Sequence, residues 1–202
     1  QSLGDMSGST ATFALVTRSD DASDRGSVYI GHVGDCRAIL RQSNGEVKVL
    51  TKDHRPALKD ERDRVCESGG KIVNDRVNGV LAITRAFGDI EFKGLEHKQI
   101  VQRPDAIKVN DVRIGKIVTS IPDIVRVDLT EIDEFLIIAC DGLWDVMSNE
   151  EAAEFVRKSL QVDNNSQEAA TQLAQTAIKL HSRDNVTVIV LHFNQKRKLL
   201  LG

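Results

Sequence analysis

The sequence contains little cysteine, few aromatic residues and no long apolar run. Its three cysteines (Cys36, Cys66 and Cys140) are widely spaced and include no C-x-x-C pair. This pattern argues against a disulfide framework or a zinc site and favours a reducing compartment, so we expect the cytoplasm or the nucleus. No apolar run approaches membrane-spanning length, and the first residues have neither the basic nor the apolar region of a signal peptide.

Aromatic residues make up 4% of the chain, too few for a platform on which nucleic-acid bases stack. The net charge of −3 gives no strong field toward nucleic acid or an anionic membrane, and we expect neither as a partner. The motifs G-x-S-x-G, G-x-x-x-x-G-K-[ST], H-E-x-x-H and the EF-hand loop are all missing from the sequence. The five histidines are dispersed, and we interpret them as structural.

The composition is that of a soluble globular protein of mixed structure. The chain has 202 residues, 41% hydrophobic and 28% charged, which suits one domain. It begins without Met, so we expect either a processed protein or a piece of a longer one. Residues 195–202 form a short tail, basic and then apolar, and the chain is expected to be a monomer.

Hairpin-forming strands occupy much of the chain, and the helices come late. Strands are predicted over residues 10–17, 28–33, 36–41, 46–50, 71–73, 125–129, 135–139 and 186–193, with an Asn44-Gly45 turn between the third and fourth. Helices are predicted over residues 60–68, 148–160 and from 166 to about 180. This order indicates antiparallel sheets packed against helices, and the predicted fold class is α+β.

The helix signals are specific at residue level. Ser148 and Glu151 have the spacing of a capping box. The last helix has an apolar stripe composed of Ala169, Leu173, Ala177 and Leu180. The stretch from Ile90 to Lys116 has no clear period, and a segment of that length within a domain is usually functional or mobile.

Two carboxylates follow the apolar run Phe135–Ala139. Asp141 comes just after this predicted strand, and Asp145 comes four residues later. Within a helical turn this spacing puts both side chains on one side, where like charges repel unless a cation offsets them. Alternatively, Asp141 caps a turn and Asp145 faces solvent. The stretch alone leaves the two interpretations open.

Two further aspartates lie at predicted strand ends. Asp184 immediately precedes the last predicted strand, 186–193, and Asp141 follows the strand 135–139. If these two strands are antiparallel neighbours, Asp184 and Asp141 would lie at the same rim of the sheet. Asp35 lies at the turn after Val33. Each has an ordinary interpretation as a turn or capping residue. Together, carboxylates without His or Cys suggest an all-oxygen site for Mg²⁺, Mn²⁺ or Ca²⁺.

Six motifs in sequential order resemble those of the metal-dependent serine/threonine protein phosphatases of type 2C. They are Ser7-Gly-Ser-Thr10, Val33-Gly-Asp-Cys-Arg37, Asp53-His-Arg-Pro56 with Asp60-Glu-Arg62, Val77-Asn-Gly-Val-Leu-Ala82 with Arg85-Ala-Phe-Gly-Asp89, Ala139-Cys-Asp-Gly-Leu-Trp-Asp145, and Ser182-Arg-Asp-Asn-Val-Thr187. The similarity covers nearly all of residues 7–193. It implies a four-layer α-β-β-α sandwich with a binuclear Mg²⁺/Mn²⁺ centre at one edge.

The resemblance assigns roles to four of the aspartates. It implies that Asp141 and Asp184 bind the two metals, and that Asp35 and Asp145 hold a weaker third ion together with Asp141. The implied activity is hydrolysis of phosphoserine and phosphothreonine in protein substrates by a metal-activated water. The stretch after Ala86-Phe-Gly-Asp89, residues 90–120, corresponds to a variable flap beside the site of this family.

The sequence also departs from the family pattern. The family's N-terminal phosphate-binding Arg, its Glu-Asp pair and its Asp-Gly-His-Gly-Gly motif with the general-acid His do not occur in this sequence. Residues 1–194 therefore correspond to a catalytic domain that lacks its N-terminal third, and we expect the 202 residues alone to be inactive. The alternatives are a truncated or inactive phosphatase-like module that binds a regulatory partner, and a Ca²⁺-stabilised structural domain.

Overall fold

The computed structural model describes residues 7–17, 25–93 and 117–193. The chain divides into two units, which are described separately. Unit 1 comprises Gln1–Phe13, Gly31–Asp35 and Asp53–Asp123. Unit 2 comprises Ala14–Ile30, Cys36–Lys52 and Ile124–Gly202.

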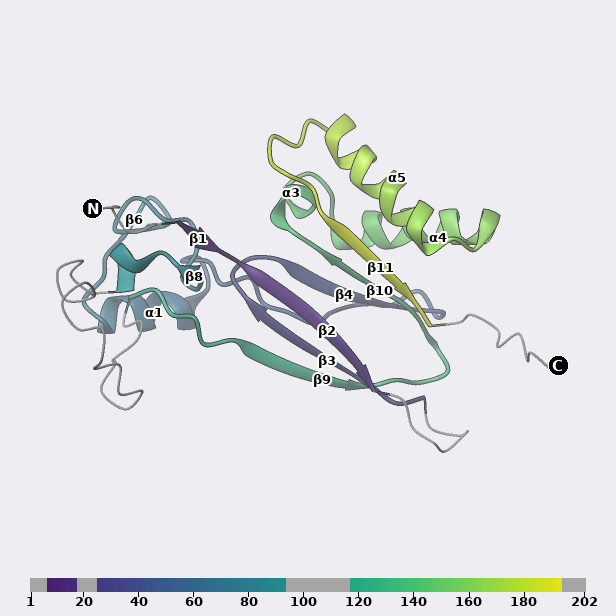
Figure 1. Ribbon diagram of the computed structural model, residues 1–202, viewed down its shortest axis with the longest axis horizontal. Helices are drawn as coiled ribbons and strands as arrows, with labels where there is room; N and C mark the ends of the chain where they lie inside the picture. Colours follow the sequence, from purple (N-terminus) through teal and green to yellow (C-terminus); the bar gives the residue numbers. More distant parts are fainter. Residues whose placement is uncertain (1–6, 18–24, 94–116, 194–202) are drawn as a thin grey trace, which may run out of the picture. The chain divides into compact units, whose positions relative to one another are not determined.

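The elements follow the predicted order closely (Figure 1). In chain order they are β1 (Gly8–Ser9), β2 (Ala11–Thr17), β3 (Ser27–Val33), β4 (Arg37–Gln42), β5 (Val47–Val49), α1 (Lys59–Glu67), β6 (Ile72–Val73), β7 (Arg76–Val77), β8 (Phe87–Gly88), η1 (Ile90–Lys93), β9 (Asp123–Asp128), β10 (Asp133–Ala139), α3 (Asp141–Trp144), α4 (Asn149–Asp163), α5 (Ser166–Lys179) and β11 (Val188–His192). The predicted strands and helices within the described residues are thus confirmed, with boundaries shifted by one to three residues.

In unit 2, a four-stranded antiparallel sheet in the order β11-β10-β4-β5 lies under the late helices. The predicted turn between β4 and β5 is confirmed, because Gly45 has a φ of 99° and its N–H donates to the Gln42 carbonyl at 3.0 Å. Strand β10 pairs with β11 in antiparallel register, with Ala139 opposite Val188. This pairing puts the C-terminal end of β10 beside the N-terminal end of β11.

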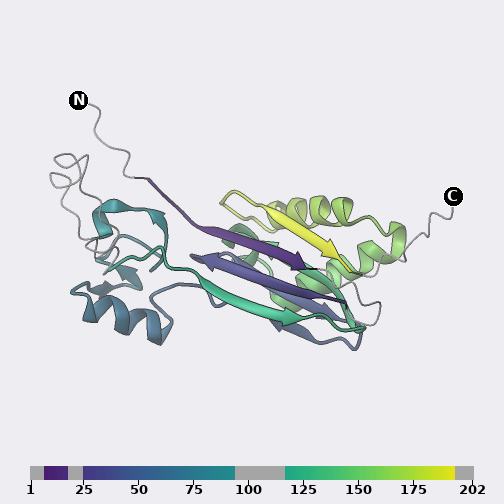
Figure 2. The same ribbon diagram turned by 60° about the horizontal axis from the view of Figure 1, so that its bottom comes forward.

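The two central strands, β10 and β4, are buried on both faces, which explains the continuous apolar run of β10. One face packs against α3, α4 and α5 through Phe135, Ile137 and Leu173, among others. The opposite face packs against the sheet β2-β3-β9 through Leu136, Ile138 and residues such as Ile30. Figure 2 shows β2, β3 and β9 side by side, with β3 between the other two. Unit 2 is therefore layered as helices, sheet and sheet.

The predicted capping box at the start of α4 is present. The Ser148 hydroxyl accepts a hydrogen bond from the Glu151 N–H at 3.2 Å, and the Ser148 N–H donates to the Glu151 carboxylate at 2.9 Å. In α5 the predicted stripe is buried at Ala169, Leu173 and Ala177. Leu180 was wrongly included, because it lies at the C-cap of α5 and is 47% exposed. The helical period ends there, so its side chain no longer points at the sheet.

Unit 1 contains α1, the short pairs β1-β8 and β6-β7, and η1. Its apolar cluster is built on Val65, Val77, Ala86 and Val118. These side chains are smaller than those of the unit 2 core. A large share of the packing in unit 1 therefore falls to charged groups, which are described below.

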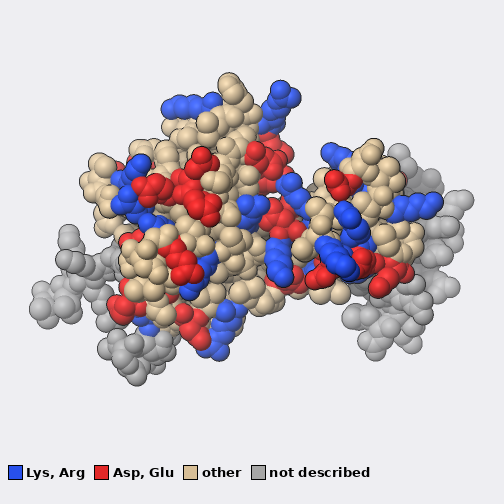
Figure 3. All heavy atoms as spheres, turned by 180° about the vertical axis from the view of Figure 1, so that it is seen from behind, with Lys and Arg blue, Asp and Glu red and all other residues tan. Residues whose placement is uncertain are grey.

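Some predictions fall outside the described residues. They concern the flap from residue 94 to residue 116, His97, and the tail at 195–202. Figure 3 shows acidic and basic side chains intermingled on the visible face, in line with the small net charge. No helix in the described ranges has the length and apolar character needed to cross a bilayer.

Candidate functional site

Asp141 and Asp145 lie on the short helix α3, at the point where β10 ends. Cys140 is extended, with φ −74° and ψ 172°, and the chain turns into α3 directly after it. The Asp145 N–H donates to the Asp141 carbonyl at 2.8 Å, and the Trp144 indole N–H donates to the Ala139 carbonyl at 2.9 Å. The two aspartates are thus one helical turn apart, as the spacing predicts. Asp141 is half-buried and Asp145 is exposed.

The segment that contains Asp184 runs beside α3. The Cys140 N–H donates to the Thr187 carbonyl at 3.3 Å, and the Ser182 hydroxyl donates to the Gly142 carbonyl at 2.6 Å. A Cβ atom at Gly142 would lie 2.3 Å from the Asn185 carbonyl oxygen, so the two backbones approach as closely as a glycine permits. From the sequence, Asp141 and Asp184 were expected to meet only if their adjoining strands are antiparallel neighbours; β10 and β11 do pair in this way, which places the two segments at one rim. Figure 1 shows the loop before β11 next to α3.

Asp184 itself is exposed at this rim. Its carboxylate accepts a hydrogen bond from the Asn185 N–H at 2.7 Å, a local contact that fixes its orientation. The sequence alternative in which Asp184 caps or turns the chain is therefore compatible with this structure. Metal binding by Asp141, Asp145 and Asp184 stays a prediction.

Asp35 belongs to unit 1 and follows β3, as predicted. It is 6% exposed, and both the Nε and an Nη atom of Arg55 lie 3.0 Å from its Oδ2. A buried carboxylate is stabilised by such a two-point contact with a guanidinium. A cation that binds Asp35 through Oδ2 has to share this oxygen with Arg55 or displace the guanidinium. The predicted joint role of Asp35 with Asp141 and Asp145 is not tested by this contact.

A second polar group in unit 1 was not identified from the sequence. The imidazoles of His32 and His54 are stacked, with centroids 4.4 Å apart and planes 3° apart. His54 Nδ1 accepts a hydrogen bond from the Gly34 N–H at 3.0 Å, which leaves Nε2 to donate to Asp123, 3.2 Å away. Burial lowers the pKa of His54 and the nearby Arg85 charge acts in the same direction, although the hydrogen bond to Asp123 opposes them. The neutral imidazole is therefore the stable form.

His32, His54 and Asp123 also offer ligand atoms that lie within 4.8 Å of one another, so this group of residues could hold a metal ion. A metal ion binds an imidazole nitrogen along its lone pair, in the plane of the ring. Two rings stacked in nearly parallel planes cannot both satisfy that condition for one ion. One ring would have to rotate out of the stack before the group could coordinate a metal.

Glu61 is the centre of the larger charged network of unit 1. Its carboxylate, 2% exposed, accepts hydrogen bonds from Arg64 at 3.0 Å, from Arg85 at 2.6 Å and from the Thr84 hydroxyl. Arg85 also donates to Asp123 at 2.7 Å. Burial raises the pKa of Glu61, but the hydrogen bonds from Arg85, Thr84 and Arg64 outweigh it and lower the pKa to about 2. Glu61 and Arg85 lie in the motifs around 53–62 and 77–89, but neither of them was assigned a role from the sequence.

Comparison with known proteins places this fold in one family. The family profile described as "Protein phosphatase 2C" matches residues 2–186, and the chain belongs to this family. It is 34% identical to mouse "Protein phosphatase 1B", over 96% of this chain and 45% of the relative. It is 39% identical to "Protein phosphatase 2C 57" of Arabidopsis thaliana, over 92% of this chain and 49% of the relative. The chain thus spans about half the length of these relatives.

Solved structures show the same fold. The chain aligns with the "Structure of a C.elegans sex determining protein" at a TM-score of 0.66 and 26% identity, over 83% of this chain and 37% of the other. It aligns with "serine-threonine phosphatase 2C from Toxoplasma gondii" at a TM-score of 0.66 and 24% identity, over 91% of this chain and 57% of the other. These likenesses confirm the predicted fold class, an α+β protein of the α-β-β-α sandwich type.

Proposed function

We propose that residues 1–194 are part of the catalytic domain of a metal-dependent protein phosphatase that hydrolyses phosphoserine and phosphothreonine in protein substrates. The main support is the antiparallel pairing of β10 and β11, which brings the segments of Asp141 and Asp184 to one rim. Membership of the protein phosphatase 2C family supports the same conclusion. The proposed substrate class, phosphoserine and phosphothreonine in proteins, is inferred from the family and not from a pocket of this chain.

The chemistry of the rim fits a hard divalent cation. Asp141, Asp145 and Asp184 offer carboxylate oxygens, and each is at least partly exposed to solvent. Mg²⁺ and Mn²⁺ prefer such ligands and keep several waters of their own. We propose that Asp141 and Asp184 hold two ions, and that Asp145 adds a weaker third site together with Asp141; the part of Asp35 in that third site stays an expectation from the family resemblance.

When bound, Mg²⁺ or Mn²⁺ supplies a nucleophilic water at neutral pH and stabilises the charge that develops on the phosphoryl group. The chain's own contribution is to hold the aspartate-bearing segments in fixed positions relative to each other. The main-chain bond from Cys140 to Thr187 and the bond from Ser182 to Gly142 tie the two aspartate-bearing segments together. Neither bond involves an aspartate side chain.

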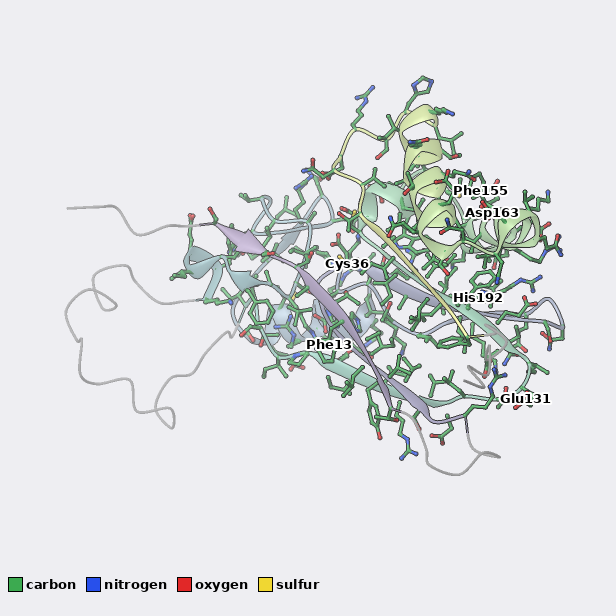
Figure 4. The ribbon with its side chains drawn as sticks, turned by 45° about the vertical axis from the view of Figure 1, so that its right-hand side comes forward. Phe13, Cys36, Glu131, Phe155, Asp163 and His192 are labelled. Atoms are coloured by element: carbon green, nitrogen blue, oxygen red, sulfur yellow. The ribbon has the colours of Figure 1, made fainter. Side chains whose placement is uncertain are left out.

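Metal binding by the chain is the direct test of the proposed ligands. Mn²⁺ binding is measured by electron paramagnetic resonance for the wild type, Asp141→Asn and Asp184→Asn. We expect each substitution to weaken binding at least about tenfold, because loss of even an outer-shell partner costs about 10- to 100-fold. Asp163→Asn is the matched control, since Asp163 (labelled in Figure 4) is an exposed aspartate at the end of α4.

Hydrolysis is tested on the intact protein, including any polypeptide that precedes Gln1. We expect Mn²⁺- or Mg²⁺-dependent release of phosphate from phosphoserine and phosphothreonine peptides, lost in Asp141→Asn and kept in Asp163→Asn. An intact protein that stays inactive with every divalent ion would favour the binding module instead. A large rise of the melting temperature with Ca²⁺, without hydrolysis, would favour the structural domain.

A further inference from the structure

Two of the three cysteines directly adjoin the ends of two paired strands, although 104 positions separate Cys36 and Cys140 in the sequence. The β4–β10 ladder is antiparallel, and its outermost pair is Arg37 opposite Ala139. The next residue outward on each strand is a cysteine. Both cysteines belong to unit 2, and each directly adjoins the strand in question.

The neighbouring hydrogen bonds show whether the cysteine pair lies at a hydrogen-bonded or a non-hydrogen-bonded position of the antiparallel ladder. Ala38 accepts from the Leu50 N–H and donates to the Thr51 hydroxyl, so its backbone groups point away from β10. The Cys140 N–H likewise points away from β4, to the Thr187 carbonyl. Since the pattern alternates along a strand, the cysteine pair occupies a non-hydrogen-bonded position of this ladder. Cα atoms at such positions are about 4.5 Å apart.

That separation falls within the range that a disulfide bridges, which is about 4.4 to 6.8 Å between Cα atoms. The two side chains also share a face of the sheet. Ile138 and Ala38, the pair two positions inward, both line the core between the two sheets of unit 2. Side chains alternate along a strand, so Cys36 and Cys140 extend from that same face. Both are half-buried at its end, and both thiols are reduced in this structure. Cys36 is labelled in Figure 4.

In the reduced state the Cys140 thiol serves another purpose. It donates to the Asn185 carbonyl at 3.1 Å and accepts from the Thr187 N–H at 3.2 Å. Thiol hydrogen bonds are weak. A change of the Cys140 side chain from one staggered rotamer to another would exchange these two bonds for contact with Cys36. The same change would loosen the loop that contains Asp184, because the loop would lose both thiol bonds and keep the Cys140 N–H bond to Thr187 and the Ser182 bond to Gly142.

We propose that Cys36 and Cys140 form a redox modification site that a hydroperoxide closes to an intramolecular disulfide. The sulfur of one thiol attacks the peroxide oxygen, which gives a sulfenic acid and releases water from H₂O₂. The sulfur of the second thiol then attacks the sulfenic sulfur; the S–S bond forms, the S–O bond breaks, and the hydroxide leaves as water with the second thiol proton. In total, two thiols and one H₂O₂ give one disulfide and two waters. A dithiol reductant reverses the reaction by exchange.

The modification also bears on the proposed metal site, and this consequence rests on the proposed function. Cys36 follows Asp35 in the chain and Cys140 precedes Asp141. The loop that would lose its two bonds to the Cys140 thiol contains Asp184. Oxidation would thus weaken Mn²⁺ binding without any change to a metal-binding residue. Cys66 lies on α1 of unit 1 and takes no part in this arrangement.

The test is peptide mapping of the oxidised chain. The protein is treated with H₂O₂, remaining thiols are alkylated, and the chain is digested with trypsin without reductant. We expect the peptide of residues 26–37 to be joined to that of residues 127–157, lighter than their sum by two hydrogens. Dithiothreitol should separate them. The joined peptide should persist in Cys66→Ser and disappear in Cys36→Ser and in Cys140→Ser.

Separate sulfinic or sulfonic acids at the two positions, or a bridge to Cys66, would overturn the proposal. The wild-type map decides this even where a serine variant fails to fold. A second readout is brief trypsin treatment of the folded chain, in which cleavage after Arg183 should be faster in the oxidised form than in the reduced form. An unchanged rate of cleavage after Arg183 would show that oxidation does not loosen the loop. Both readouts are independent of phosphatase activity, so they stand or fall separately from the proposed function.

Discussion

Each of the two units is stabilised internally by a different kind of interaction. Unit 2 has two apolar clusters, one on each face of its central sheet, with side chains such as Phe135 and Leu173 fully buried. Unit 1 has a smaller apolar cluster and a buried carboxylate, Glu61, bound by two arginines. Apolar packing depends little on pH, whereas a buried ion pair depends on the charge of each partner. The comparison predicts that the two units respond differently to substitution and to acid.

The largest effect is expected from Phe135→Ala in unit 2. Phe135 is 1% exposed and packs between β10 and the helices, so its removal leaves a cavity. We expect a loss of about 3 to 5 kcal/mol in the free energy of unfolding, measured by urea denaturation. Ile189→Ala is the control, because Ile189 on β11 is 53% exposed and should change stability little. Equal losses for both substitutions would contradict the role of this core.

The next effect is expected from Glu61→Gln in unit 1. This change leaves Arg85 and Arg64 without their buried counter-charge, and removal of one partner of a buried pair costs about 3 to 5 kcal/mol. Arg64 is partly exposed, so we expect the lower end of that range. Amide hydrogen exchange should locate the loss in unit 1. Glu67→Gln, on the exposed side of α1, is the control, and faster exchange spread evenly over both units would count against the comparison.

Acid should abolish the difference between wild type and Glu61→Gln. The pKa of Glu61 is about 2 in the folded chain and 4.5 ordinarily, so its carboxylate stabilises the fold fully above pH 4.5. That contribution falls as the pH drops from 4.5 toward 2, because the unfolded chain then binds a proton that the folded chain does not. Urea denaturation at pH 7, 4.5 and 3 should show the difference shrinking. A difference that stays constant over this range would exclude Glu61 as the source.

The smallest effect is expected at the start of α4 in unit 2. Ser148→Ala removes the side-chain half of the capping box, which costs about 1 kcal/mol. Ser148→Asp keeps an acceptor for the Glu151 N–H and should recover most of the stability. Thermal unfolding followed by circular dichroism measures both variants. If the aspartate variant is as unstable as the alanine variant, the cap is not the cause.

Local patterns in the sequence were sufficient to predict most of unit 2. The apolar run of β10, the Ser148–Glu151 spacing and the stripe of α5 are periodic or positional signals that neighbouring residues carry themselves. The antiparallel pairing of β10 with β11 was only a condition in the sequence analysis, and the structure supplied it. Leu180 was the exception, because the periodic pattern continued one step past the end of the helix.

The network of unit 1 could not be predicted in the same way. Glu61 and Arg85 are 24 positions apart, and Arg85 and Asp123 are 38 apart. Such contacts depend on how the chain folds back, and no periodicity marks them. His54 gave a similar result, since nothing in its sequence neighbourhood indicates a stack with His32. The contact of Asp35 with Arg55, 20 positions on, also became visible only in the structure.

Gly142 has a consequence for how this rim can change during evolution. Its backbone lies against the Asn185 carbonyl with no room for even a methyl group. At this closest approach the spacing between the Asp141 and Asp184 segments is set by main-chain contact, while the Ser182 hydroxyl and the Cys140 thiol add bonds across it. An alanine at position 142 would push one segment outward. Among descendants of this chain we therefore expect glycine to persist at position 142 for a packing reason that is separate from any role of the neighbouring Asp141.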